Sequence, residues 1–574
     1  MGNSWFRGQR GWTWMIAAVL ALVPCVGRSE RPRAQPITLS IATTNDVHGR
    51  IWQLPLLGGY LDNLRAARAE DGGALLLLDA GDIFQGTIES NSTEGAAMVR
   101  AYRALGYDAV TLGNHEFDFG PVGPHAVPLS AAEDPPGALK ARVAQSELPF
   151  LNANLRGPKG KPLPIPRLKR SILLRRRGVA VGIVGGVTRD LLRTTHADNT
   201  RGIEVLPLSA AIADEAKRLR AQGARVVIAV VHAGGDCKKL DDPNDLTSCD
   251  ADAEAFDLAR QLPAGLVDVI VAGHTHSGLA HRVNGIALVE AFSNGRAFGR
   301  VDIRVPPRAN EPLSVHILAP VGLCAENLEL PCCARTESYE GRPVQRSDKV
   351  LRAIQADLER ARAERERPTG VEVVSEVKRE NKRESPLSNL VADLMLRASP
   401  GADAAFSNAG GVRISLPKGP LRYGTVFEMF PFDNSFATLK LTAAQLAAIL
   451  AGNLRAESGI LALSGLTAAA SCKDRELQVQ LFDRKGQPLA PERPLTVVTS
   501  DFLAASGDGV LSGLSLPPDA IHVQRERLIR DALLEGLMAY PGGKLDGGDK
   551  ALFDPAAPRL RYQGSRPLRC GAEP

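Results

Sequence analysis

Short motifs that combine histidine with aspartate or asparagine recur along the first half of the chain, and each follows an apolar run rich in branched residues. The apolar runs span residues 37–43, 74–78, 109–112, 226–231 and 266–271. Alternating with helical stretches, such runs predict the strands of α/β and α+β layered domains. Because open α/β sheets place their ligand crevices at the carboxyl ends of the strands, we expect these motifs to form one site.

The residue types in these motifs are typical of a centre that holds two metal ions. The motifs are Asp46-Val47-His48, Gly81-Asp82, Gly113-Asn114-His115-Glu116, Val231-His232 and Gly273-His274-Thr275-His276. A hydrolytic pair of cations needs oxygen and imidazole donors from several strand ends and one bridging carboxylate. Any one of these histidines taken alone could be a buried core residue, but the whole set indicates a two-metal hydrolase.

Length and composition limit the alternatives. The 574 residues predict two sizeable domains. A hydrophobic content of 44% with 23% charged residues is ordinary for a globular protein and argues against wholesale disorder or a multi-span membrane protein. The net charge of +5 is spread thinly, and basic runs such as 167–170 and 175–177 are expected to be solvated faces. We therefore expect no binding to a nucleic-acid polymer.

The chain divides into two halves with a connector between them. We predict a first domain over residues 36–320, a loop and linker helix over 321–369, a second domain over 370–562 and a polar tail over 563–574. The helix is expected in the charged stretch 348–367, because proline and glycine follow it directly.

The amino terminus has the pattern of an export signal over residues 1–27. Arg7 and Arg10 precede an uncharged stretch from Trp12 to Val23 that is too short to span a bilayer. This pattern predicts a periplasmic or extracellular protein without a transmembrane anchor. Lipid modification of Cys25 is the alternative, but Pro24 directly before it fits that pattern poorly.

The cysteines agree with export, because an oxidising compartment favours disulfides. Seven cysteines follow Cys25, so one must stay unpaired in a monomer. We predict a local disulfide between Cys237 and Cys249, and Cys324 could pair with Cys332 or Cys333. A thiolate metal site is the competing interpretation, but the chain contains no Cys-x-x-Cys pair.

The order and spacing of the five motifs resemble those of the calcineurin-like metallophosphatases. The chain is most similar to the secreted 5′-nucleotidase and UDP-sugar hydrolase family, and the likeness extends over nearly all of the chain after the signal. The resemblance implies a four-layer α/β/β/α metallophosphatase domain, followed by an α+β domain that binds the nucleotide.

By this resemblance, two divalent cations are held by seven residues. Asp46, His48 and His276 would hold one, Asn114, His232 and His274 the other, and Asp82 would bridge them. Hard oxygen and imidazole ligands suit Zn, Mn, Co or Fe, and the identity of the metal stays open because some relatives have Gln at the position of His276. His115 and Asp118 correspond to a catalytic pair in which the carboxylate keeps the imidazole protonated, so that it stabilises negative charge on the phosphoryl group.

The second half carries motifs that the same family uses for the substrate. Asn408 and Arg413 lie in a glycine-containing segment, and the resemblance places Arg413 on phosphate, which a planar guanidinium suits. Phe432 and Phe502 would stack on the two faces of a base, and Asp508 would bind the ribose hydroxyls.

A further basic position is left open between two residues. Arg379 and Arg383 are both candidates for phosphate, because Ser388 and the nearby Pro386 depart from the family pattern and obscure the correspondence.

These residues predict a nucleotide substrate and hydrolysis of nucleoside 5′-monophosphates, with di- and triphosphates as further candidates. UDP-sugars and 2′,3′-cyclic nucleotides are alternative substrates for the same site. A surface binding protein without catalytic activity is an alternative function, but the complete set of metal ligands argues against it. Metals on one domain and the nucleoside pocket on the other imply that closure of the domains accompanies catalysis. The oligomeric state is left open by the sequence.

Overall fold

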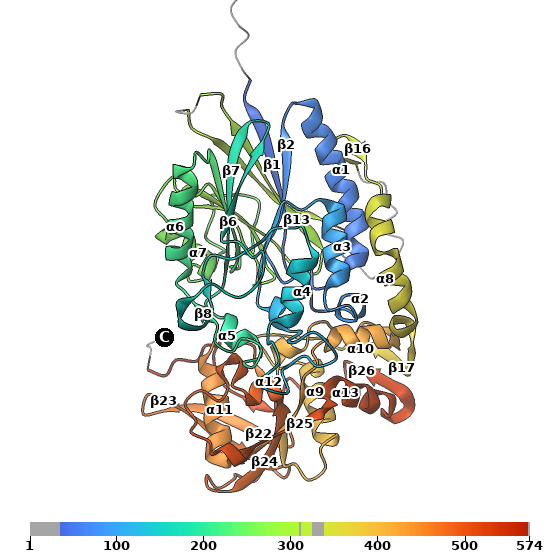
Figure 1. The fold of residues 1–574 in the computed structure, drawn as a ribbon. Coiled ribbons are helices and arrows are strands. Elements are labelled where there is room, and N and C mark those ends of the chain that lie inside the picture. Colours follow the sequence, from blue (N-terminus) through green and yellow to red (C-terminus); the bar gives the residue numbers. More distant parts are fainter. Residues whose placement is uncertain (1–34, 309–310, 324–337, 572–574) are drawn as a thin grey trace, which may run out of the picture.

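The computed structural model describes residues 35–308, 311–323 and 338–571, which form two lobes joined by helix α8 (Asp348–Glu366), as Figure 1 shows. The predicted signal peptide and Cys25 lie outside the described residues. Within the described ranges, no helix combines the length and the apolar character that crossing a membrane requires.

The first lobe is built on two six-stranded sheets. One has the order β14-β13-β1-β2-β3-β4 and the other the order β11-β12-β10-β9-β7-β6. The first sheet consists of β1 (Ile37–Thr44), β2 (Ala74–Asp79), β3 (Ala109–Thr111), β4 (Phe150–Leu151), β13 (Ala297–Val305) and β14 (Ser314–Gly322). The second consists of β6 (Ser171–Arg176), β7 (Val179–Val187), β9 (Val226–His232), β10 (Val269–Val271), β11 (Gly278–Val283) and β12 (Ile286–Ala291).

Helices cover the outer faces of these sheets. Helices α1 (Leu54–Glu70) and α3 (Ala96–Leu105) pack on the first sheet, and α8 lies outside them, against both. Helices α6 (Leu208–Ala221) and α7 (Glu254–Gln261) pack on the second sheet. Apolar side chains from both sheets, such as Ile41, Leu76 and Ile228, are fully buried between them. The predicted α/β/β/α layering is therefore confirmed.

The predicted strands are present, with one notable difference in length. The strand expected over 266–271 begins only at Val269, because residues 263–266 form a turn in which Leu266 N–H donates to Pro263 O at 3.1 Å. Neighbouring strands β1, β2 and β3 run parallel, as do β7, β9, β10 and β12. Their carboxyl ends therefore meet at the same end of the lobe, where the polar motifs follow.

The second lobe has a central five-stranded sheet of order β21-β18-β24-β20-β25. Its strands are β18 (Ala404–Asn408), β20 (Ser435–Thr442), β21 (Leu461–Ser464), β24 (Pro494–Ser500) and β25 (Ile521–Leu528). Two three-stranded sheets flank it, formed by β17 (Pro368–Ser375), β19 (Gly419–Arg422) and β26 (Lys544–Asp546), and by β22 (Thr467–Lys473), β23 (Glu476–Phe482) and β27 (Leu560–Arg561). The main helices are α9 (Pro386–Arg397), α10 (Tyr423–Met429), α11 (Ala443–Arg455), α12 (Asp501–Ala504) and α13 (Ile529–Met538).

The start of α9 explains the unexpected Pro386. Proline suits the first turn of a helix, where its missing N–H would have no intrahelical partner. The Ser385 side chain caps the helix by accepting from Ser388 N–H at 3.2 Å. Pro386 therefore serves the local helix start.

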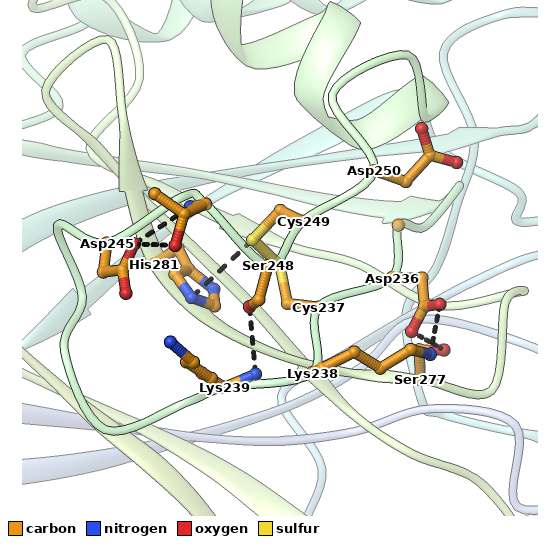
Figure 2. Close-up of a disulfide and its surroundings, with 12 residues drawn as sticks. Asp236, Cys237, Lys238, Lys239, Asp245, Ser248, Cys249, Asp250, Ser277 and His281 are labelled. Carbon is orange, nitrogen blue, oxygen red and sulfur yellow. Dashed lines mark hydrogen bonds and ion pairs between the residues drawn. A yellow bond between two sulfur atoms is a disulfide. The ribbon is translucent and has the colours of Figure 1, made fainter. Parts of the chain in front are cut away.

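Two disulfides are present among the described residues. Cys237 pairs with Cys249, as predicted, and Figure 2 shows this bond beside His281. His281 Nε2 lies 3.8 Å from Cys249 Sγ, but the sulfurs are bonded to each other and therefore supply no thiolate ligands. Cys472 pairs with Cys570, which was not predicted. The expected pairing of Cys324 falls outside the described residues.

The Cys472–Cys570 bond closes a loop with a sequence separation of 98 and ties the polar tail to β22. Removing it in a Cys472→Ser, Cys570→Ser double variant is expected to lower the free energy of unfolding by about 2–5 kcal/mol, because a long loop in the unfolded chain regains its entropy. Urea denaturation followed by fluorescence measures this change. A double variant with the same free energy of unfolding as the wild type would contradict it.

Candidate active site

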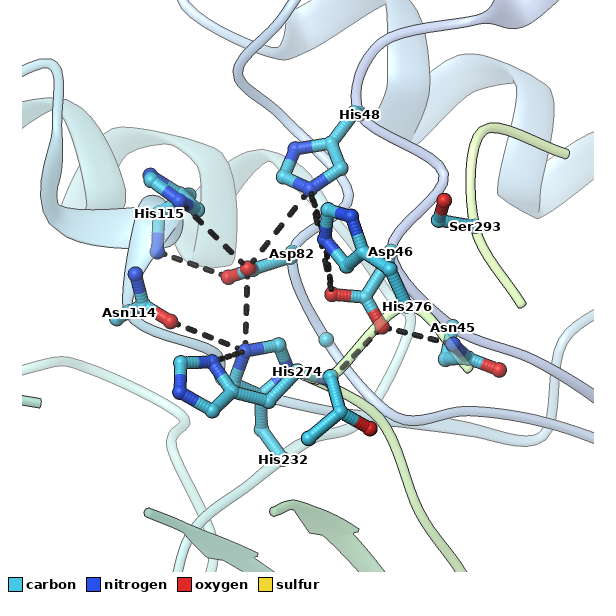
Figure 3. Close-up of polar contacts among 12 residues, drawn as sticks. Asn45, Asp46, His48, Asp82, Asn114, His115, His232, His274, His276 and Ser293 are labelled. Carbon is cyan, nitrogen blue, oxygen red and sulfur yellow. Dashed lines mark hydrogen bonds and ion pairs between the residues drawn. The ribbon is translucent and has the colours of Figure 1, made fainter. Parts of the chain in front are cut away.

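The structure brings all seven predicted metal ligands together at the carboxyl ends of the strands, as Figure 3 shows. They form two groups, one of Asp46, His48 and His276 and one of Asp82, His232 and His274. Asn114 joins the second group, with Oδ1 3.0 Å from His232 Nε2.

Asp82 belongs to the second group but also faces the first. Its Oδ2 is 3.1 Å from His232 Nε2 and 4.0 Å from His48 Nε2. In the first group, His276 Nε2 lies 3.2 Å from Asp46 Oδ1 and 3.1 Å from His48 Nε2. A carboxylate in this place can contact both members of a cation pair.

Backbone groups fix how the imidazoles face the centre. His48 Nδ1 lies 2.9 Å from Gln85 O and His232 Nδ1 lies 2.8 Å from Ala80 O, so both rings donate from Nδ1 and direct Nε2 inward. The backbone is left-handed at five of the seven ligands, with φ between 49° and 82°. These residues are Asp46, His48, Asp82, His274 and His276. Non-glycine residues adopt such values at a cost, and they are concentrated at functional sites.

The donor set fits divalent cations. Asp46 Oδ1 is buried and accepts no hydrogen bond from the described part of the chain. Burial, together with the Arg413 guanidinium, holds the pKa of His48 well below its usual range, and burial beside His232 lowers the pKa of His274 to about 3. Although burial opposes it, Asp82 raises the pKa of His232 to about 10. The low pKa values keep the His48 and His274 imidazoles neutral, as metal ligands must be. The raised pKa of His232 reflects the attraction of the Asp82 carboxylate for positive charge, which a bound cation would satisfy in place of the proton.

His115 and Asp118 form the predicted pair beside the metal ligands. His115 Nδ1 donates to Asp118 Oδ2 at 2.5 Å, and His115 Nε2 lies 4.0 Å from Asp82 Oδ2. Burial acts to lower the pKa of His115, but Asp118 and Asp82 outweigh it and raise the pKa above its usual value. The imidazole is therefore suited to carry a proton and to donate from Nε2.

Two buried carboxyl groups that the sequence did not single out brace the ligand loops. Glu116 accepts from the backbone N–H groups of Asp82, Ile83 and Gly113 at 2.6–2.9 Å. Glu290 accepts from the Thr275 hydroxyl at 2.8 and 2.9 Å and from Ser277 N–H at 3.3 Å, and these two residues flank His276. Glu116 lies within a quoted motif, but nothing in the local sequence marks Glu290.

A cavity of about 370 Å³ connects the ligand set with the second lobe. From the first lobe it is lined by Asp82, Asn114, His115 and His276, and from the second by Arg413, Phe432, Phe502 and Asp508. Ala126 and Val127, from a loop of the first lobe, also contribute to the wall. The cavity therefore includes groups from both halves of the chain.

The predicted substrate residues lie around this cavity, with one exception. Asn408 Nδ2 donates to Asp508 Oδ2 at 2.7 Å, and Arg413 lies 5.8 Å from the centre of the Phe432 ring. Arg413 also brings Nη2 to 3.1 Å from His48 Nε2, which places a guanidinium beside the metal ligands. Arg379 lines the cavity, where burial and Arg413 lower its pKa to about 10, whereas Arg383 is exposed and is not part of the lining.

The lobes also meet through buried ion pairs near α8. Arg365 of α8 contacts Glu89 of the first lobe at 3.2 Å and Glu428 of the second at 2.9 Å. Arg50, two residues after His48, contacts Glu428 at 3.2 Å. The position of the second lobe is thereby linked to the segment that carries His48.

Comparison with known proteins agrees with this arrangement. Residues 39–278 match the family model for calcineurin-like phosphoesterases, and residues 363–513 match the model for the 5′-nucleotidase C-terminal domain. Protein UshA of Yersinia enterocolitica is 25% identical over 504 residues, 82% of this chain and 86% of the relative. A 5′-nucleotidase of Vibrio cholerae is 25% identical over 527 residues, 82% of this chain and 85% of the relative.

The fold has a counterpart among solved structures. The 5′-nucleotidase precursor from Thermus thermophilus superposes with a TM-score of 0.69 at 23% identity, covering 89% of this chain and 100% of that chain. The two family models match the two lobes in the order of the chain, and the donor set described above lies where the lobes meet. The chain therefore belongs to the 5′-nucleotidase family of calcineurin-like phosphoesterases and is a metal-dependent phosphoester hydrolase.

Proposed function

We propose that this protein is an exported 5′-nucleotidase that hydrolyses nucleoside 5′-monophosphates to nucleoside and phosphate. The observation that carries the proposal is the shared cavity, in which the metal ligands of the first lobe face Phe432, Phe502 and Asp508 of the second. A nucleotide has the corresponding parts in the same order, with phosphate at one end and a planar base at the other.

Each group in the cavity has a defined task. Asp46, His48, Asp82, Asn114, His232, His274 and His276 hold two divalent cations, which when bound activate the nucleophile and neutralise charge on the phosphoryl group. Arg413 and Arg379 bind the phosphoryl oxygens, and Asp508, oriented by Asn408, accepts hydrogen bonds from the ribose hydroxyls. Protonated His115, held by Asp118, donates to the oxygen on which negative charge develops.

Export is supported by the chemistry of the cysteines. Two disulfides among the described residues require an oxidising compartment to persist. Together with the predicted signal over residues 1–27, they favour a periplasmic or extracellular location.

A substrate panel tests the proposal. Phosphate release is measured with AMP, UMP, ADP, ATP, UDP-glucose and 2′,3′-cyclic AMP, each with Mn²⁺, Zn²⁺, Co²⁺ or Fe²⁺ and each with chelator. We expect release from the 5′-monophosphates that chelation abolishes and the added metal restores. If only UDP-glucose or only the cyclic nucleotide were hydrolysed, that compound would be the substrate instead of a 5′-monophosphate. If no compound were hydrolysed, the protein would be a binding protein.

The two phenylalanines provide a prediction about substrate affinity. Stacking contributes about 1–3 kcal/mol per base, so Phe432→Ala and Phe502→Ala are each expected to raise KM for AMP about 10-fold. Ribose 5-phosphate has no base, so its kcat/KM is expected to stay within about twofold of the wild type. Phe553→Ala, outside the cavity lining, is the matched control. An unchanged KM for AMP in both cavity variants would contradict the stacking role.

A further inference from the structure

Two polar side chains line the main cavity without a role in the mechanism described above. His196 follows helix α5 (Leu191–Thr194) of the first lobe, and Asp501 is the first residue of α12 in the second lobe, directly before Phe502. They approach each other across the lobes, with His196 Nε2 3.8 Å from Asp501 Oδ2.

Asp501 joins the two segments that carry the phenylalanine rings. Its Oδ1 accepts from Phe502 N–H at 2.8 Å and from Ser435 N–H at 3.1 Å, and Ser435 lies three residues after Phe432. The residue is 5% exposed. The carboxylate is thus positioned beside the base-stacking rings, while Oδ2 faces His196.

The tautomer of His196 follows from its other nitrogen. Nδ1 accepts from Asp198 N–H at 3.3 Å, and burial lowers the pKa of the imidazole, so the ring is neutral and its proton is on Nε2. That Nε2–H is buried and has no hydrogen-bond partner within the described residues, because Asp501 Oδ2 is too distant. A buried donor without a partner is costly and calls for a ligand or a water.

We propose that His196 and Asp501 recognise the edge of the nucleobase that Phe432 and Phe502 stack against. Asp501 Oδ2 accepts an N–H of the base, and His196 Nε2–H donates to the ring nitrogen or carbonyl oxygen next to it. The inference rests on the proposed 5′-nucleotidase function. Adenine, guanine, cytosine and uracil all carry an N–H beside an acceptor, so the pair selects for such an edge rather than for one base.

Purine riboside 5′-monophosphate separates this recognition from stacking. It has the ring system, ribose and phosphate of AMP but lacks the amino group, so it presents no N–H to Asp501. A pair of hydrogen bonds to a base edge discriminates by about 1–3 kcal/mol, and the wild-type kcat/KM is therefore expected to favour AMP by about 10-fold or more.

Two substitutions test the residues themselves. Asp501→Asn keeps an oxygen for the Ser435 and Phe502 N–H groups but replaces the acceptor Oδ2 with a donor, and His196→Ala removes the imidazole. In both variants, the kcat/KM for AMP is expected to lie within about twofold of the kcat/KM for purine riboside 5′-monophosphate. His125→Ala and Asp519→Asn, both exposed and outside the cavity lining, are the matched controls and are expected to keep the wild-type preference.

A binding measurement removes the dependence on turnover. Calorimetry with adenosine and with purine riboside on metal-depleted wild-type protein is expected to show about 10-fold tighter binding of adenosine. Because this test uses only the wild-type protein, it does not depend on the folding of any variant. The inference would be overturned if the wild type hydrolysed AMP and purine riboside 5′-monophosphate with equal kcat/KM and bound adenosine and purine riboside with equal affinity. That result would leave the 5′-nucleotidase function intact. Absence of hydrolysis of any nucleotide would instead overturn the function on which it rests.

Discussion

Replacement of Asp82 by alanine is expected to lower kcat/KM for AMP by at least about 1,000-fold, more than the loss of a single hydrogen-bond donor costs. Asp82 is a carboxylate of the second ligand group that also faces the first, 3.1 Å from His232 Nε2 and 4.0 Å from His48 Nε2. Its removal also withdraws Oδ1 from the His115 backbone N–H, to which it is bonded at 2.8 Å. Both the metals and the loop of the catalytic pair are therefore affected.

Metal content and activity are measured on the same Asp82→Ala sample. Elemental analysis is expected to find two divalent ions per chain in the reconstituted wild type and fewer in the variant, and excess metal should not restore turnover. Asp62→Ala, which removes an exposed carboxylate paired with Arg65, controls for a general loss of charge. If Asp82→Ala kept two ions per chain and near-normal turnover, Asp82 would not be a metal ligand.

His115→Ala is expected to keep both metals yet lower kcat by at least about 100-fold, the usual scale for a group that stabilises developing charge. His115 contacts Asp118 and faces Asp82 at 4.0 Å, but it is not one of the two ligand groups. Its loss therefore removes a proton donor and not a ligand, so that kcat should fall and KM for AMP should change little.

The contrast with Asp82→Ala is the sharpest part of this test. Both variants lose turnover, but only the ligand variant is expected to lose metal. Asp118→Asn should give a smaller loss, because the imidazole remains and only its carboxylate partner is neutralised. Near-normal turnover of His115→Ala, or loss of metal from it, would exclude the proposed role.

Much of the fold was predictable because the signals are local. The buried strands β2 and β9 are nearly continuous apolar runs, and β1 alternates apolar residues with Thr and Ser; both patterns predicted strand bounds within one or two residues. The one larger error, the late start of β10, arose because Leu266 and Val267 are apolar and favour a strand, but Leu266 closes a turn by donating from its N–H to Pro263 O.

The candidate site was predictable to different degrees. Motifs at the ends of parallel strands in one sheet converge at the same edge, so the seven candidate ligands could be named from the sequence before the structure brought them together. The choice between Arg379 and Arg383 could not be made, because four residues in a loop can face opposite directions. Only the structure directs Arg379 into the cavity and Arg383 to the surface.

The sequence alone determined the chemistry of this protein. Asp, Asn and His side chains in five motifs specify a site for hard or intermediate divalent cations, whatever the details of packing. The tertiary structure decided which distant residues meet: Cys472 with Cys570, Glu290 with the loop of His274 and His276, and His196 of one lobe with Asp501 of the other. Such pairs depend on how the sheets and lobes pack. A short stretch of sequence therefore does not indicate which distant residue will contact it.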